Sequence, residues 1–229
     1  MLKSCLTPAC CLLLSSAILI AAEPNAKEDA QAKAVQHFQA TSARAEAGDV
    51  DALYELAKLY SKGLGVARDE AHAVELFGKV AEKNDARGQS MLGVMYTNGR
   101  GVEIDYAVAL GWFRKAAAQK SAHAQYNLGY MYSAGKGVER DPVIAAQWYR
   151  RAALQNDTGS QRILAGMYAS GRGIPQDLPQ AYAWNVLASE RGDAAAQKQL
   201  VALQAELSPE QIAAGKQQAA ELAKAIAGE

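Results

Sequence analysis

Hydrophobic positions recur along this chain with a fixed spacing of 36 residues. Each copy carries a leucine, a small residue directly after it and a tyrosine four residues after the leucine, followed by a pair of glycines. The leucines and tyrosines are Leu56, Leu92, Leu128 and Leu164, and Tyr60, Tyr96, Tyr132 and Tyr168. A period of this length is typical of a solenoid, in which stacked helix pairs bury a continuous core that no single pair could bury alone.

Each copy predicts two helices, here named helix A and helix B. In the second copy, Asp85 is the expected N-cap of helix A, because its carboxylate can accept backbone N–H bonds. Gly99 and Gly101 then end helix A, since glycine adopts backbone angles that other residues resist. Asp105 is the expected N-cap of helix B. This parsing predicts four full repeats and a partial fifth, at residues 48–83, 84–119, 120–155, 156–191 and 192–206.

The two ends of the chain predict capping segments. Residues 23–47 are rich in Ala, Gln, Lys and Glu, which favours a leader followed by an N-terminal capping helix. Residues 207–229 predict a C-terminal capping helix with Ser208 as its N-cap.

Residues 1–22 have the pattern of a secretory signal peptide. Lys3 precedes an apolar run of about ten residues, and the small pair Ala21-Ala22 precedes Glu23. We therefore expect a periplasmic or secreted protein with no stable membrane insertion after cleavage. An uncleaved anchor is the alternative, and a lipid anchor at Cys10 is less favoured because the apolar run follows that cysteine.

Composition and charge narrow the possible functions. The 24 Lys and Arg residues balance the 24 Asp and Glu residues, so there is no basic excess to neutralise phosphates, and we expect no nucleic-acid partner. All three cysteines lie within residues 1–22, so a cleaved product would have no disulfide framework.

Candidate catalytic residues are few. The three histidines, His37, His72 and His123, do not have metal-ligand spacing. Ser133 and Lys136 match a Ser-x-x-Lys pattern, but this serine is expected at the end of a helix A instead of at the start of a helix in a pocket. We expect no enzyme activity, cofactor or metal.

The repeats resemble the Sel1-like repeat family, a relative of the tetratricopeptide repeat. The resemblance rests on motifs such as residues 57–69, with Gly63, Gly65 and Asp69 recurring in every copy, and covers Gly48 to about Leu203. It implies an all-α, α/α solenoid with a right-handed superhelix, and an adaptor role in signalling or envelope assembly. Some cysteine-rich secreted members are β-lactamase-like, but this chain lacks the paired cysteines of their repeats.

Function is expected where the copies disagree. On helix A, residues spaced by four, three and four positions share one face, and this face is commonly concave in such solenoids. We name the predicted partner-binding residues on and beside this face the variable stripe: Asp51, Glu55, Lys58, Arg87, Met91, Val94, His123, Tyr126, Asn127, Tyr130, Arg162 and Ile163.

The variable stripe is predicted to bind a protein partner, and Tyr126 and Tyr130 are its expected anchors, since tyrosine is enriched at interfaces. Alternatively, the stripe is drifting surface, or Met91 and Ile163 pack between helices. Other functional hypotheses are an immunity protein that occludes a periplasmic toxic effector and, less favoured, a β-lactamase-like or peptidoglycan hydrolase.

Overall fold

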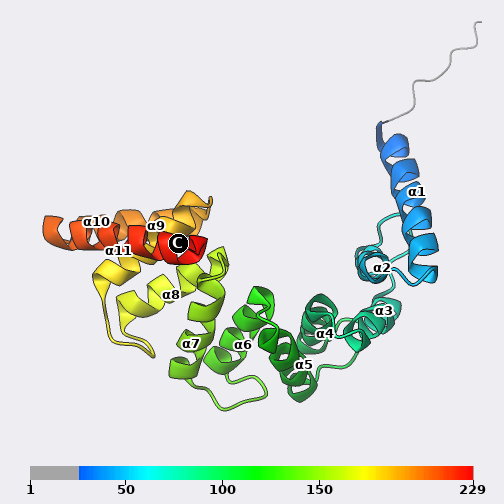
Figure 1. The fold of residues 1–229 in the computed structure, drawn as a ribbon, viewed down its shortest axis with the longest axis horizontal. Helices are drawn as coiled ribbons and strands as arrows, with labels where there is room; N and C mark the ends of the chain where they lie inside the picture. Colours follow the sequence, from blue (N-terminus) through cyan, green and yellow to red (C-terminus); the bar gives the residue numbers. More distant parts are fainter. Residues whose placement is uncertain (1–25, 229) are drawn as a thin grey trace, which may run out of the picture.

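The structure, a computed structural model, describes residues 26–228 and consists of helices joined by short turns (Figure 1). The expected signal peptide lies outside the described residues. The helices are α1 (Ala26–Glu46), α2 (Val50–Lys62), α3 (Glu70–Glu82), α4 (Ala86–Asn98), α5 (Tyr106–Ala118), α6 (Ala122–Ala134), α7 (Pro142–Ala153), α8 (Thr158–Ser170), α9 (Leu178–Glu190), α10 (Ala194–Glu206) and α11 (Pro209–Ala227). Within residues 26–228, no helix is both long and apolar enough to cross a membrane.

The helices form a chain of antiparallel pairs. Helices α2, α4, α6 and α8 are the A helices, and each packs on the B helix that follows it and on the B helix of the preceding repeat where there is one. The pairs follow an open arc with its two ends apart, and α2, α4 and α6 lie nearer its inner side (Figure 1). This arrangement confirms the predicted all-α solenoid.

Aspartate caps begin most of these helices, as the spacing predicts. The Asp85 side chain accepts a hydrogen bond from the backbone N–H of Arg87, and Asp105 accepts from Ala107 and Val108. Ser208 begins α11 with a reciprocal capping box to Gln211. Each cap satisfies N–H groups that have no partner within their own helix.

The recurring glycine pair has two different physical causes. Gly99, at φ +66°, ends α4 in the left-handed conformation, and its N–H bonds to the carbonyl of Met95. Gly101 also has positive φ, but in addition an ideal Cβ there would lie 2.2 Å from the carbonyl oxygen of Glu70, in the first turn of α3. The second glycine is therefore required because neighbouring repeats approach each other there, backbone against backbone.

The core is continuous along the arc. Leu56, Leu92, Leu128 and Leu164 are all buried, as the repeat predicts. The aromatic residues at the centre of the first three B helices are Phe77, Phe113 and Tyr149, each 3% exposed or less. The neighbouring Trp112 and Trp148 are half-buried, with Lys115 and Arg151 over their rings.

The C-terminal end departs from the repeat. Helix α10 packs on α9 as a further A helix would, whereas α11 folds back over α9. Gly215 of α11 permits this contact, because an ideal Cβ there would lie 2.7 Å from the ring of Tyr182. Tyr182 thus contacts α11, and its hydroxyl accepts a hydrogen bond from Gln204 of α10. Helix α11 therefore covers α9 without continuing the arc.

Candidate functional site

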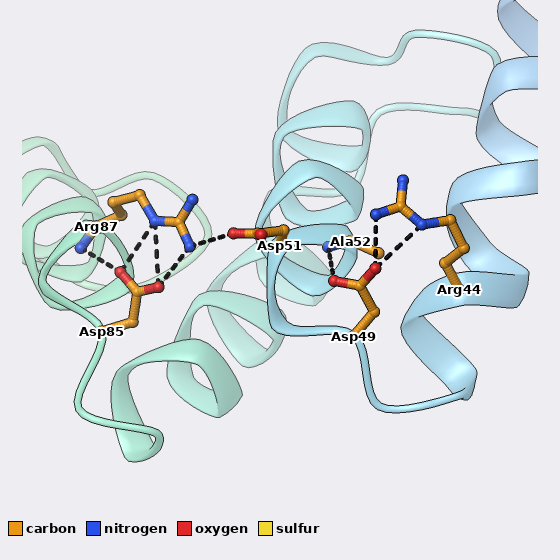
Figure 2. A network of polar contacts seen from close by, with 6 residues as sticks. All are labelled: Arg44, Asp49, Asp51, Ala52, Asp85 and Arg87. Carbon is orange, nitrogen blue, oxygen red and sulfur yellow. Dashed lines mark hydrogen bonds and ion pairs between the residues drawn. The ribbon is translucent and has the colours of Figure 1, made fainter.

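Arg87 links the first two A helices. Its guanidinium donates to Asp85 at the start of α4 and to Asp51 in the first turn of α2, at 2.6 and 2.5 Å (Figure 2). The guanidinium also lies 5.1 Å from the ring centroid of Tyr54, within cation–π range. Hydrogen bonding to Arg87 lowers the pKa of the Asp85 carboxyl below its ordinary value of 3.8. Asp51 and Arg87 of the variable stripe are therefore already paired with each other.

A second ion pair joins α1 to α2 in the same manner. Arg44 donates to Asp49, the N-cap of α2, whose other oxygen accepts from the N–H of Ala52 (Figure 2). The pKa of Asp49 is lowered, first by the backbone bond from Ala52 and then by Arg44. Both networks place an arginine beside the N-cap of an A helix.

His123 joins the second and third A helices. Its Nδ1 lies 2.7 Å from the Ser90 hydroxyl, which is buried in α4. More than a third of the surface of His123 remains exposed, yet its neighbours remove enough solvent to lower the pKa of the imidazole below 6.5, an effect that Asp157 partly opposes. The neutral ring is therefore favoured near neutral pH.

These residues enclose a shallow hollow of about 290 Å³. It is lined by residues of α2 and α4, and by the start of α6: Tyr54, Arg87, Ser90, Met91, Ser121 and His123. Arg87, Met91 and His123 were predicted for the site, and the structure brings them together. Ser121 was not predicted. The signal was its place as an N-cap, where the other A helices of the array carry Asp49, Asp85, Asp157 and Asp193.

The middle of the variable stripe combines exposed and packed residues. Tyr130 is 37% exposed, with the ammonium of Lys136 5.0 Å from its ring centroid. Tyr126 is half-buried, and its ring packs edge-on against the buried Tyr149 at a centroid distance of 5.8 Å. Burial raises the pKa of Tyr149 to about 12. Asn127 is half-buried and donates to the backbone carbonyl of His123.

The other stripe residues have partners within the chain. Glu55 and Lys58 form an ion pair at 2.7 Å on α2. Met91, Val94 and Ile163 are half-buried and pack against core residues, in agreement with the alternative that Met91 and Ile163 pack between helices. Arg162, at the far end, donates to Asp193, the N-cap of α10, at 3.1 Å.

A contact of the same spacing recurs between neighbouring A helices. Tyr54 contacts Arg87, Ser90 contacts His123, and Tyr126 lies 3.5 Å from the Cβ that Gly159 lacks. In each case the second residue lies 33 positions after the first. A tyrosine on one A helix contacts an arginine or a glycine on the next, and a serine contacts a histidine. At each of these three joints the paired residues fill the space between neighbouring repeats.

The Ser-x-x-Lys pattern lies at the C-terminal end of a helix A, as the repeat predicts. Ser133 lies in the last turn of α6, while the ammonium of Lys136 lies over the rings of Tyr106 and Tyr130. Among residues 26–228, no three His, Cys, Asp or Glu side chains are grouped so that they could hold a metal ion. What α2, α4 and the start of α6 provide is a shallow hollow whose lining mixes polar and apolar side chains.

The fold defines an α-solenoid repeat protein. The Sel1 repeat model matches residues 50–85, 86–121, 122–157 and 159–193, more than half of the chain, and the chain therefore belongs to the Sel1 repeat family. Sel1 repeat proteins generally mediate protein–protein interaction, and their fold is typically a non-enzymatic scaffold.

The solved structures that are similar to the chain include the following two. One is c5321, a protective antigen of uropathogenic Escherichia coli strains that displays an SLR fold, with 35% identity and a TM-score of 0.69 over 82% of this chain. The other is a Sel1 repeat protein from Oxalobacter formigenes, with 34% identity and a TM-score of 0.63 over 66% of this chain. The chain spans 41% and 62% of the lengths of these two proteins. A search of curated proteins found no significant match.

Proposed function

We propose that this chain is an exported adaptor or regulator that binds a protein partner along the inner face of α2, α4 and α6. The observation that carries the proposal is the hollow between Tyr54 and His123, whose lining combines aromatic, polar and thioether side chains from α2, α4 and the start of α6. Such a mixture of polar and apolar groups suits a polypeptide segment.

Within the variable stripe we separate residues that hold neighbouring repeats together from those that we assign to the partner. Asp51, Arg87 and Arg162 are engaged in ion pairs between helices, and Tyr126 packs on the core. Tyr130 is the exposed aromatic residue of the stripe, and it is the anchor we assign to the partner interface.

Export is proposed on two grounds. The charged start, apolar run and small-residue exit of residues 1–22 form the pattern that the export machinery recognises. The similar protein from uropathogenic E. coli is described as a protective antigen, which agrees with a location beyond the cytoplasm. Cell fractionation together with the mass of the mature chain tests this. We expect a periplasmic or secreted product that begins near Glu23, and a full-length cytoplasmic product would contradict it.

Site-specific photocrosslinking tests the interface. A benzoylphenylalanine at Tyr130 should crosslink a partner in cells, whereas the same probe at Val143 on α7, which is 51% exposed, serves as the matched control. Both positions are exposed and apolar, and the main difference is that Tyr130 lies on a helix A and Val143 lies on a helix B. Equal crosslinking at both positions, or at Val143 alone, would place the interface elsewhere.

A further inference from the structure

A second pocket lies beyond the hollow at His123, between the last two A helices. Its volume is about 270 Å³, and its walls come from α8, α9 and α10. It is lined by Ala165, Gly166, Ala169, Asn185, Gln199, Ala202, Leu203 and Glu206. None of these residues belongs to the variable stripe.

The pocket exists because the fourth repeat departs from the first three at two positions. Asn185 on α9 occupies the place of the core aromatics Phe77, Phe113 and Tyr149. Gly166 on α8 occupies the place of Lys58, Val94 and Tyr130, and an ideal Cβ there meets no atom within 4 Å. The ring that fills this region in earlier repeats is thus replaced by a short amide, and the side chain above it is absent.

Two buried polar atoms in the lining have no partner. Asn185 is 1% exposed, and neither its Oδ1 nor the Oε1 of Gln199 has a hydrogen-bond partner within residues 26–228. An amide oxygen buried without a donor is unfavourable, because it has lost its hydrogen bonds to water and gained none from the protein. A ligand that brings a donor would relieve this.

The electrostatics of the lining favour a cation. Glu206 is its single charged residue, and no Lys, Arg or His contributes to it. The lining also uses the last turns of α8 and α10, where the negative ends of two helix dipoles lie. Ala165, Ala169, Ala202 and Leu203 supply apolar walls suited to an aliphatic stem.

We propose that this pocket between α8, α9 and α10 binds a basic side chain, lysine or arginine, of a partner polypeptide. The stem lies against the alanines and Leu203, and the cationic head donates to the amide oxygens of Asn185 and Gln199, with Glu206 supplying the opposite charge. The biological setting, a partner segment on the inner face, rests on the proposed function. The binding chemistry of the pocket does not.

Peptide titration followed by NMR tests the pocket without any knowledge of the partner. The ¹⁵N-labelled protein is titrated with the acetylated and amidated tripeptide Gly-Lys-Gly, with its arginine counterpart, and with a norleucine counterpart that keeps the stem and lacks the charge. We expect saturable shifts of the Asn185 and Gln199 side-chain amides with a basic peptide, at a millimolar dissociation constant, and at least fivefold weaker binding of norleucine. Equal shifts with norleucine, or none at about 10 mM basic peptide, would overturn the proposal.

Two variants make the test specific. Gly166→Leu should fill the pocket and abolish the shifts, whereas Gly111→Leu on α5, where an ideal Cβ also has open space, should leave them intact. Asn185→Phe restores the aromatic of the earlier repeats and should likewise abolish binding. Wild-type affinity in Gly166→Leu would overturn the proposal. A failed crosslink at Tyr130 would instead contradict the proposed function and leave the titration result standing.

Discussion

At the second glycine of each turn, substitution by alanine should push two neighbouring repeats apart. Gly101→Ala adds a Cβ that would lie 2.2 Å from the Glu70 oxygen and 2.7 Å from the Ala71 nitrogen, whereas real Cβ atoms stay beyond about 3.0 Å. Both obstacles are backbone atoms, so no rotamer change relieves the clash. The turn after α4 must move away from α3.

A matched control isolates this clash from backbone strain. Gly192 has φ +86°, and an ideal Cβ there meets nothing within 4 Å. Gly192→Ala therefore carries only the strain of the left-handed conformation, about 1–2 kcal/mol, partly offset by a less flexible unfolded chain. Gly101→Ala carries the same strain and an overpacking term of about 1–3 kcal/mol, at the upper end because backbone opposes it.

Urea unfolding followed by circular dichroism measures the difference. We expect Gly101→Ala to lose about 2–3 kcal/mol more than Gly192→Ala. We also expect a smaller denaturant slope, because separated repeats unfold less cooperatively. Equal losses for the two variants, within about 0.5 kcal/mol, would refute the account of the second glycine as a close approach between repeats.

Three further outcomes are expected. Gly166→Ala should stabilise the protein by about 0.5–1 kcal/mol, because alanine favours helix and its Cβ has space there. Gly93→Ala should instead destabilise it by about 1–3 kcal/mol, because its Cβ would lie 2.5 Å from the Phe113 ring. Thermal melts check this pair, since the two variants should shift the melting temperature in opposite directions. Leu128→Ala, at a site with no exposure, should cost about 2–5 kcal/mol in urea unfolding. The pKa of the His123 imidazole, measured by NMR titration, should lie below 6.5 in the folded protein. Because this folded pKa is depressed, the stability linked to His123 is present above pH 6.5 and is lost as the pH falls through the folded pKa. A measured pKa above 6.5 would contradict the desolvation argument.

The repeat period predicted the scaffold well, for a physical reason. Residues that face the core or end a helix meet the same environment in every copy, so the same residue types recur. The leucines, the aspartate caps and the glycine turns are of this kind. The period could not decide which of two adjacent aromatics enters the core. Trp112 and Phe113 recur together as aromatic pairs with Trp148 and Tyr149, and only packing shows that Phe113 and Tyr149 are central.

The candidate site was harder to predict by comparing the copies. Comparing equivalent positions across the copies identifies the positions that vary. It does not show that a residue on one A helix contacts the residue 33 positions later on the next A helix. Both hollows include a residue that differs from its equivalents in the other repeats. Ser121 stands where the other A helices have an aspartate N-cap, and Asn185 stands where the earlier B helices have an aromatic residue. A departure at a core or cap position is therefore as informative as variation on the surface.

Contacts between neighbouring A helices limit which variable residues can serve a partner. Replacing Tyr126 would leave the space above Gly159 unfilled, and replacing Arg87 would leave Asp51 and Asp85 without their cation. Loss of binding in either variant would therefore be ambiguous, because a contact between neighbouring repeats would be lost with it. Tyr130 is exposed and packs under the flexible side chain of Lys136, so its replacement can alter the face while the joint between repeats stays intact.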